Sequence, residues 1–476
     1  MARLLFLQSI EHEFMGPMYL SSYLRKGGHE CRLLVGRTLD DFHREIARFK
    51  PHFVAFSVMS GSHRWAIHIA GQIKKEFGIP NIFGGPHPTF FPEMTRDERV
   101  DVICRGEGEE AALELLNRVD KGLAYSDVPN LHVRSGGVLC KNSLRPLIGE
   151  LDECPYPDRE LYDSLDGRLD RSVRSVITSR GCPFHCAFCF EEAMRELYRG
   201  KGKYVRLRRI DRVIEECRIL RDRYKVRTIY FADDVFGMSK SWLYEFLPRY
   251  RRDVGLPFIC LVRADIVSSD EEYAFHLAEG GCRSVFFGIE TGNETLRNRV
   301  LAKRLSDAQI CRAAEFLHKA GIRFRTYNIL GLPGETLEDA LSTVQMNIDI
   351  GADYLWCSVF MPFPGTELAR LAAEEGFVER AFDIDDLGRS FFTCSNLVNM
   401  PHIKEMQNLQ KFFQTAVLWP WSLPIIRKLI RIPPNTIFNW WFGLIYFLLY
   451  VKSEGRGFWQ TLKFAVRNYR HILAKE

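Results

Sequence analysis

The sequence lacks the features that would place it in a membrane or outside the cell. Its most apolar stretch, residues 438–451, is fourteen residues long, whereas a spanning helix needs about 20. The N-terminus has no charged region, apolar core and cleavage site of a signal peptide, and the 13 cysteines follow no regular disulfide framework. We therefore expect a cytoplasmic protein in a reducing compartment.

The net charge is small and unevenly distributed along the chain. The net charge is +5, and residues 401–476 contain eleven Lys and Arg against three Asp and Glu, so this tail carries +8 and the rest −3. No basic run has the spacing of a nucleic-acid-binding module, and we expect no nucleic acid partner. A hydrophobic fraction of 46% is typical of folded protein, and 476 residues suggest two or three domains.

Three cysteines, however, stand close together after a β-branched run. Cys182, Cys186 and Cys189 are separated by three and then two residues, and thiolates at such spacings hold iron–sulfur clusters. No obvious fourth ligand is near, so one iron would be left open for chemistry. Structural zinc is the alternative, but it prefers four ligands in paired sets, and His185 could reach it only from a strained position beside Cys186.

This loop resembles the CxxxCxxC motif of the radical S-adenosylmethionine (radical SAM) superfamily, with an aromatic residue, Phe188, directly before the third cysteine. The resemblance implies that the three cysteines hold a 4Fe-4S cluster and that S-adenosylmethionine binds the open iron through its amino and carboxylate groups. One electron would then cleave the sulfonium, giving a 5′-deoxyadenosyl radical or supporting methyl transfer. The protein would contribute orientation, redox tuning and exclusion of water and oxygen.

The sequence of residues 1–145 predicts a Rossmann-like α/β domain. Short apolar runs alternate with amphipathic stretches, which is typical of a doubly wound parallel sheet. Ligands bind beyond the carboxyl ends of such strands, where glycines let a backbone approach a bulky ligand. The predicted strands are residues 3–8, 31–35, 53–57, 81–83 and 100–103.

The glycine-rich segments at these strand ends resemble those of the cobalamin-binding domain that precedes the radical domain in a large radical SAM subgroup. Read alone, each segment could be an ordinary turn, but all of them occur ahead of the cysteine motif. The contacts that the resemblance implies are Ser57, Gly84, Gly85, His87, Gly106 and Glu107.

The sequence lacks the Asp-x-His-x-x-Gly motif that supplies a cobalt-binding histidine in other corrinoid proteins. Asp41 and His43 come nearest, but Ile46 stands where the glycine should be and the segment predicts a helix. We expect cobalamin without a lower histidine ligand.

Residues 146–172 predict an ordered, proline-containing linker, and residues 173–385 predict a radical SAM domain. Six βα units are fewer than a closed eight-fold barrel needs, so we expect a partial (β/α)6 barrel with its chemistry at the carboxyl ends of the strands. The predicted strands are residues 175–178, 228–231, 258–262, 284–288, 325–330 and 354–360.

Polar or glycine-rich residues follow several of these strands. The carboxylates after the second strand could accept from an ammonium, the arginine after the third could meet a carboxylate, and the glutamate after the fourth could bind ribose. The glycine–proline turn after the fifth could pass close to adenine, and each residue alone could equally be a cap or a salt bridge. By resemblance, the S-adenosylmethionine contacts are Phe188, Asp233, Asp234, Arg263, Glu290, Asn328, Gly331 and Gly334.

Residues 386–476 predict a helical, basic region that holds five of the eight tryptophans. Tryptophans, basic residues and an apolar face suit a helix that lies in a membrane interface, here through residues 415–476. A helical layer over the open side of the barrel needs apolar surface just as much. The two interpretations are compatible, and either suits a large hydrophobic substrate.

The sequence therefore predicts a cobalamin-dependent radical SAM enzyme, most simply a methyltransferase that acts on an unactivated carbon of a hydrophobic small molecule. Its electron donor would be a reductase partner such as flavodoxin or ferredoxin. The sequence assigns no catalytic residue. One alternative is an anaerobic cyclase or ring-rearranging enzyme acting on a porphyrin or lipid. Another is a corrinoid-binding sensor with a vestigial barrel, against which the intact cysteines argue.

Overall fold

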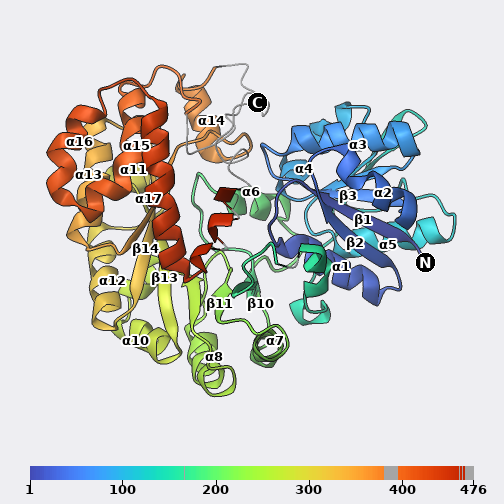
Figure 1. The fold of residues 1–476 in the computed structure, drawn as a ribbon, viewed down its shortest axis with the longest axis horizontal. Helices are drawn as coiled ribbons and strands as arrows, with labels where there is room; N and C mark the ends of the chain where they lie inside the picture. The colour runs from blue at the N-terminus through green and yellow to red at the C-terminus, as the bar shows by residue number, and fades with distance from the viewer. Residues whose placement is uncertain (166, 380–394, 460, 464, 467–476) are drawn as a thin grey trace. The chain divides into compact units, whose positions relative to one another are not determined.

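A computed structural model describes residues 1–165, 167–379, 395–459, 461–463 and 465–466. The chain folds into two units, each with its own sheet (Figure 1). The first consists mainly of Met1–Leu169 with Glu196–Tyr204, and the second mainly of Asp170–Arg195 with Val205–Lys463.

The first unit contains a seven-stranded sheet in the order β2-β1-β3-β4-β5-β6-β7. Its first five strands are parallel, as the sequence predicts, and the last two form an antiparallel hairpin at the edge. The hairpin was not predicted, although Gly136 and Gly137, both at positive φ, are the residues that a tight hairpin turn requires. The strands are β1 (Arg3–Gln8), β2 (Glu30–Val35), β3 (Phe53–Ser57), β4 (Asn81–Gly84), β5 (Val102–Cys104), β6 (Leu131–Ser135) and β7 (Val138–Lys141).

Helices cover both faces of this sheet, so it is doubly wound. Alternate residues of β1 enter two different cores, Leu4 and Phe6 on one face and Leu5 and Leu7 on the other. That is the expected pattern for a parallel strand buried on both sides. The helices are α1 (Met15–Lys26), α2 (Leu39–Phe49), α3 (His63–Phe77), α4 (Pro86–Phe90) and α5 (Glu109–Asp120).

The segment that follows is ordered by short 3-10 helices at Leu151–Glu153 and Arg159–Leu165. Its Tyr162 is fully buried, donates a hydrogen bond to Gln8 Oε1 (2.9 Å) and accepts one from Phe14 N (3.1 Å). The segment is thereby fastened to the first unit.

The second unit contains a six-stranded parallel sheet in which every strand neighbours the next one in the chain, β15-β14-β13-β12-β11-β8. This is the partial (β/α)6 barrel that the sequence predicts. Its strands are β8 (Val173–Val176), β11 (Thr228–Phe231), β12 (Phe258–Leu261), β13 (Cys282–Glu290), β14 (Arg323–Leu330) and β15 (Tyr354–Val359), with a short ribbon of β9 (Ser179–Arg180) and β10 (Arg206–Leu207) beside them.

Helices cover the outer face of this sheet (Figure 1). Alternate strand residues such as Ile229 and Phe231 join a large buried core with them, which leaves Tyr230 on the inner face. The helices are α6 (Phe190–Leu197), α7 (Ile210–Asp222), α8 (Lys240–Asp253), α9 (Ala264–Ser268), α10 (Glu271–Glu279), α11 (Glu294–Arg299), α12 (Asp307–Lys319), α13 (Leu337–Asp349) and α14 (Glu367–Glu374).

The C-terminal helices pack onto the last strand of the barrel. They are α15 (Ile403–Leu418), α16 (Leu423–Leu429) and α17 (Thr436–Glu454). Gln410 and Gln414 of α15 donate hydrogen bonds to the carbonyl oxygens of Cys357 (2.9 Å) and Leu355 (3.0 Å), which satisfies the edge of β15. None of the helices among the described residues combines the length and apolarity needed to cross a bilayer.

Candidate functional site

The three clustered cysteines lie between β9 and α6 in the second unit. All three are free and half-buried. Ala187 fixes the middle of the loop, because its N–H donates to Leu301 O (3.0 Å) and its carbonyl accepts from Leu368 N (2.9 Å). Burial raises the pKa of Cys182 to about 11 and that of Cys189 to about 12.

The arrangement of these thiols fits a cluster better than a single ion. No group of three or more His, Cys, Asp or Glu in the described part of the chain is close enough to hold one metal ion. Thiolates that hold a 4Fe-4S cluster each bind a different iron, so they stand farther apart than the ligands of one zinc. The Nδ1 atom of His185, the fourth ligand that the zinc alternative would need, lies 3.2 Å from a carboxylate oxygen of Glu192 instead.

Arg263, at the end of β12, braces the cysteine loop. Its guanidinium lies 3.7 Å from the ring centroid of Phe184, and its Nη1 is 3.7 Å from Cys186 Sγ. Two hydrogen bonds to Asp265 (2.9 and 3.1 Å) and one to Lys303 O (2.9 Å) fix its orientation. A permanent positive charge therefore stands beside one of the three thiols.

The two aspartates after β11 have different surroundings. Asp233 is buried, and its Oδ1 accepts from Thr178 N (3.0 Å), Thr178 Oγ1 (2.9 Å) and Ser179 Oγ (2.5 Å). Burial raises the pKa of Asp233 to about 6 despite these hydrogen bonds. Asp234 is exposed and accessible to a ligand. Asp233 thus ties the start of the cysteine loop to β11, and Asp234 is the carboxylate that could meet an ammonium group.

Glu290, at the end of β13, forms a buried ion pair with Lys303 (2.5 Å). Its backbone is left-handed (φ 69°), and the pairing of β13 with β14 is irregular between Gly288 and Glu290. Such strained backbone concentrates at functional sites. Lys303 Nζ also lies 5.8 Å from the ring centroid of Phe188.

Lys303 is one functional candidate that sequence analysis missed. It connects Glu290, Phe188 and Arg263, three residues far apart in the chain. Its neighbours Ala302 and Arg304 both have positive φ, so the loop is held in an unusual conformation around it. No local motif marks a single lysine in a loop as part of a site.

A second missed residue shapes the turn after β14. Glu335 is buried, and its Oε2 accepts hydrogen bonds from Gly331 N (2.5 Å) and Leu332 N (3.1 Å). Burial raises its pKa to about 8. Gly331 and Gly334 both have positive φ, and a Cβ added at Gly334 would meet nothing within 4 Å. The turn therefore offers open backbone to a ligand at Gly334, whereas Gly331 is buried and a Cβ there would approach Ile403 Cδ1 to 2.8 Å.

Asn328 points away from this turn. Its Nδ2 donates to Thr326 Oγ1 (3.0 Å), and its Oδ1 accepts from Asn347 Nδ2 (2.9 Å) on α13. This amide therefore belongs to a buried polar network between β14 and the helix that covers it.

In the first unit, β3 and β4 present open backbone at their carboxyl ends. Ser57 is exposed, and a Cβ added at the adjacent Gly84 would meet nothing within 4 Å. Gly85 has φ 96°, and a Cβ there would approach Val58 O to 2.9 Å, so the turn requires glycine. This bare edge fits a bulky ligand such as a corrin tail.

The other three predicted cobalamin contacts are engaged within the first unit. His87 is buried and stacks on His63 at 4.2 Å between ring centroids. Gly106 packs against the hydroxyl of Tyr198, and Glu107 accepts a hydrogen bond from Ile148 N (2.9 Å).

His43, the nearest approach to a cobalt-binding histidine, lies on α2 as predicted. It pairs with Glu76 (2.8 Å).

Family models match both units. Residues 176–346 match the radical SAM superfamily, and residues 10–116 match the B12 binding domain. The fold is also that of a known structure: the radical S-adenosylmethionine methyltransferase TsrM from Kitasatospora setae superposes with a TM-score of 0.69 at 17% identity, covering 89% of this chain and 90% of that one.

Three characterised or named relatives are similar over most of the chain. An uncharacterised methyltransferase of Pyrococcus horikoshii is 31% identical over 364 residues, which cover 74% of this chain and 77% of the relative. The anaerobic magnesium-protoporphyrin IX monomethyl ester cyclase of Rubrivivax gelatinosus is 26% identical over 368 residues (74% and 64%). The hopanoid C-3 methylase of Methylococcus capsulatus is 27% identical over 372 residues (75% and 68%).

The two matched domains account for the cofactors, which are a 4Fe-4S cluster, S-adenosylmethionine and cobalamin. Radical SAM enzymes need a reductant and a substrate in addition. On the family models and the relative from Pyrococcus together, this chain belongs to the cobalamin-dependent radical SAM methyltransferase family.

Proposed function

We propose that the protein methylates an unactivated carbon of a hydrophobic small molecule. The observation that carries the proposal is the gathering of Cys186, Arg263, Lys303 and Glu290 at the carboxyl ends of the barrel strands, in a chain with a B12-binding domain. A saturated carbon without an activating group requires radical chemistry, which these cofactors supply when bound: one-electron cleavage of S-adenosylmethionine and donation of a methyl group.

In this proposal the cluster is held by the three thiols of the cysteine loop, Cys182, Cys186 and Cys189. S-adenosylmethionine would meet Asp234 with its ammonium group and the turn of Gly331 and Gly334, exposed at Gly334, with its adenine. Phe188 and the paired Glu290 provide the remaining contacts. Asp233, Arg263 and Asn328 act as positioning residues, because Oδ1 of Asp233, the guanidinium of Arg263 and the amide of Asn328 are already hydrogen-bonded within the protein.

Arg263 and Lys303 give this site its electrostatics. Both are buried cations whose charge is matched by a carboxylate, Asp265 and Glu290 respectively. Removing one partner of such a buried pair is strongly destabilising, because it leaves the other charge buried and uncompensated. The pairs therefore keep the guanidinium beside Cys186 and the Glu290 carboxylate in place before any ligand arrives.

Cobalamin in this proposal lies against the bare edge formed by Ser57, Gly84 and Gly85. His87 supports that edge from beneath through its stack on His63, and Gly106 and Glu107 hold the neighbouring turn. His43 would not serve as a lower ligand to cobalt, because its Nε2 lies 2.8 Å from Glu76 on the surface of α2 and α3.

Labelled methionine tests the reaction directly. Reduced holoenzyme, with flavodoxin or ferredoxin as electron donor, is incubated with S-adenosylmethionine deuterated at its methyl group and an apolar cell extract. We expect deuterium in an apolar product, together with S-adenosylhomocysteine from the methyl donor and 5′-deoxyadenosine and methionine from the molecule cleaved to abstract hydrogen. Formation of 5′-deoxyadenosine with an unlabelled, ring-closed product would instead support the cyclase alternative, the activity named for the Rubrivivax relative.

We further propose that the protein contacts a membrane surface through α17. Its exposed apolar side chains, Ile437, Trp440, Leu444 and Leu448, recur at helical spacing on one face and are 46 to 77% exposed. No charged residue occurs between residues 436 and 451. An apolar helix face with tryptophan in a basic segment suits the headgroup region of an anionic bilayer.

Acidic substitutions on this face test membrane contact. The variant Ile437→Asp/Trp440→Asp should bind phosphatidylglycerol vesicles at least about tenfold more weakly, because each change removes roughly 1.5–3 kcal/mol of apolar burial. Phe275→Asp, at an exposed apolar residue on α10 (42% exposed), is the matched control and should bind normally. A flotation assay compares the wild type, the double variant and Phe275→Asp. Equal partitioning of these three proteins onto vesicles would show that α17 covers the barrel and does not contact a membrane.

A further inference from the structure

Two of the three clustered thiols meet backbone donors. Burial raises the pKa of Cys182 and of Cys189, and the N–H groups of Phe184 and Glu191, respectively, act against this rise by hydrogen bonding to the thiols. Every residue except proline supplies a backbone N–H. The surroundings of these two sulfurs therefore follow from the course of the loop itself.

The third thiol meets a side chain from another strand. Nη1 of Arg263, which follows β12, lies 3.7 Å from Sγ of Cys186 and donates to it. The same guanidinium lies over the ring of Phe184 in the cysteine loop, 3.7 Å from its centroid. Arg263 is only 8% exposed. Buried charges are screened much less by salt than exposed ones, so this cation acts strongly on the neighbouring sulfur.

The surrounding protein fixes the orientation of Arg263. Its Nε and Nη2 donate to the two carboxylate oxygens of Asp265 (2.9 and 3.1 Å), and Nη2 also donates to Lys303 O (2.9 Å). The planar fork of arginine thus presents one edge to a carboxylate and directs Nη1 at the thiol. Asp265 also offsets the positive charge, so the site combines a directed N–H with a largely matched charge.

These two residues have opposite effects on an iron–sulfur cluster held by the loop. Hydrogen bonds to the sulfurs and the net charge nearby are among the features that set the reduction potential of such a cluster. Reduction adds one electron and hence one negative charge. The guanidinium of Arg263 stabilises that charge, whereas the carboxylate of Asp265 weakens the effect by partly neutralising the guanidinium.

We infer that Arg263 and Asp265 set the reduction potential of the cluster, Arg263 raising it and Asp265 lowering it. The inference rests on the proposed function, which assigns the cluster to the cysteine loop, and adds the residues that tune electron entry. The electron comes from the reductase partner, which is oxidised by one electron as the cluster is reduced by one. No bond forms or breaks in this step.

A redox titration followed by electron paramagnetic resonance tests the inference without substrate or S-adenosylmethionine. The full chain is reconstituted anaerobically and poised with dithionite and mediator dyes. Arg263→Met keeps an unbranched side chain against Phe184 but removes the charge and the N–H, and should lower the equilibrium constant for reduction about tenfold, or about 59 mV for a one-electron couple. Asp265→Asn should raise the constant, because the guanidinium is then unmatched while Lys303 O and Phe184 still hold it.

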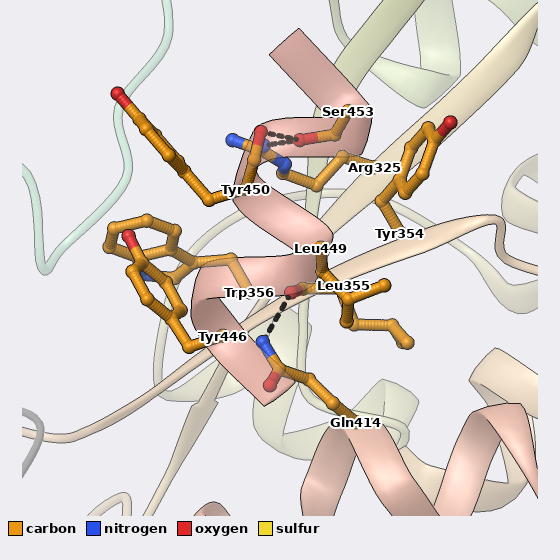
Figure 2. Close-up of a pocket in the computed structure, with 9 residues that line it drawn as sticks. All are labelled: Arg325, Tyr354, Leu355, Trp356, Gln414, Tyr446, Leu449, Tyr450 and Ser453. Atoms are coloured by element: carbon orange, nitrogen blue, oxygen red, sulfur yellow. Dashed lines mark hydrogen bonds between the residues drawn. The ribbon is translucent and has the colours of Figure 1, made fainter. Parts of the chain in front are cut away.

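Arg325 provides the matched control. It too is a buried arginine that lies over a phenylalanine ring (Phe286, 4.2 Å) and pairs with a carboxylate (Glu454, 3.5 Å). Figure 2 shows it bonded to Ser453 of α17. It stands five residues before the end of β14, about 17 Å along an extended strand, whereas Arg263 follows the end of β12. Arg325→Met should therefore leave the potential unchanged.

Opposite shifts in Arg263→Met and Asp265→Asn, with Arg325→Met at the wild-type value, would support the inference. Wild-type potentials in both variants, or shifts in the same direction, would overturn it, since residues that only hold the loop in shape have no reason to act with opposite signs. If Arg263→Met does not retain iron, Asp265→Asn decides alone, and the absence of an upward shift overturns the inference. Iron analysis reports separately on the proposed function: a wild type without iron contradicts the cluster assignment, whereas full iron with unchanged potentials contradicts only the tuning.

Discussion

Cys186→Ala should abolish the iron–sulfur cluster. Anaerobically reconstituted wild type should contain about four irons per chain, and the variant should lose them together with the broad visible absorbance of the cluster. The cysteine loop places three thiols and no close fourth ligand among the residues that the structure describes, so the loss of one thiol leaves two, too few to hold the cluster. Iron analysis and electron paramagnetic resonance of the reduced protein measure the outcome.

The control for this prediction is a cysteine outside the loop. Cys311 is exposed on α12 and has no part in the site, so Cys311→Ala should retain full iron. Equal iron in Cys186→Ala and wild type would contradict the assignment. If the wild type instead binds one zinc ion and no iron, the cysteine loop is a structural zinc site.

Lys303→Met should destabilise the second unit by about 3–5 kcal/mol, because it leaves the Glu290 carboxylate buried without its partner. The same change should weaken binding of S-adenosylmethionine, since Glu290 then loses the contact that orients it. Guanidinium unfolding followed by tryptophan fluorescence gives the first quantity, and equilibrium dialysis of the nucleotide under anaerobic conditions gives the second.

Two further variants test whether the ion pair between Lys303 and Glu290 accounts for the loss of stability. Lys303→Met/Glu290→Gln removes both charges and should recover most of the lost stability, because no ion is then left unpaired. It should not recover nucleotide binding. Arg427→Met breaks an exposed ion pair with Glu338 (3.4 Å) and should cost less than about 1 kcal/mol. A loss in Lys303→Met no larger than that of Arg427→Met would show that Glu290 does not depend on the lysine.

Local patterns in the sequence were sufficient for most of the architecture. The run at residues 228–231 is rich in β-branched and aromatic residues and is bounded by polar residues, so it predicts a strand without knowledge of its partners, and β11 has those limits. The hairpin of β6 and β7 was not predicted, because it departs from the alternation of strands and helices in the rest of the unit and only two adjacent glycines mark its turn.

The site residues also differ in whether a local sequence pattern marks them. The cysteines were recognisable because their spacing is itself the signal. Lys303 and Glu335 were not recognisable, since each acts on residues brought to it by the fold: Glu290 and Phe188 in one case, the backbone of the turn at Gly331 in the other. A single charged residue has no local pattern that distinguishes a buried partner from a solvated one.

By itself the sequence determined the order of the two domains, the cysteine loop and the succession of strands that carry the polar residues, because spacing and hydrophobic periodicity are properties of the chain. Only the tertiary structure decided which of two adjacent aspartates is buried, that Asn328 faces α13, and that α17 packs against β15. Those outcomes depend on which face of each strand meets the helices and on where a distant helix packs, and both are fixed by burial of the whole core.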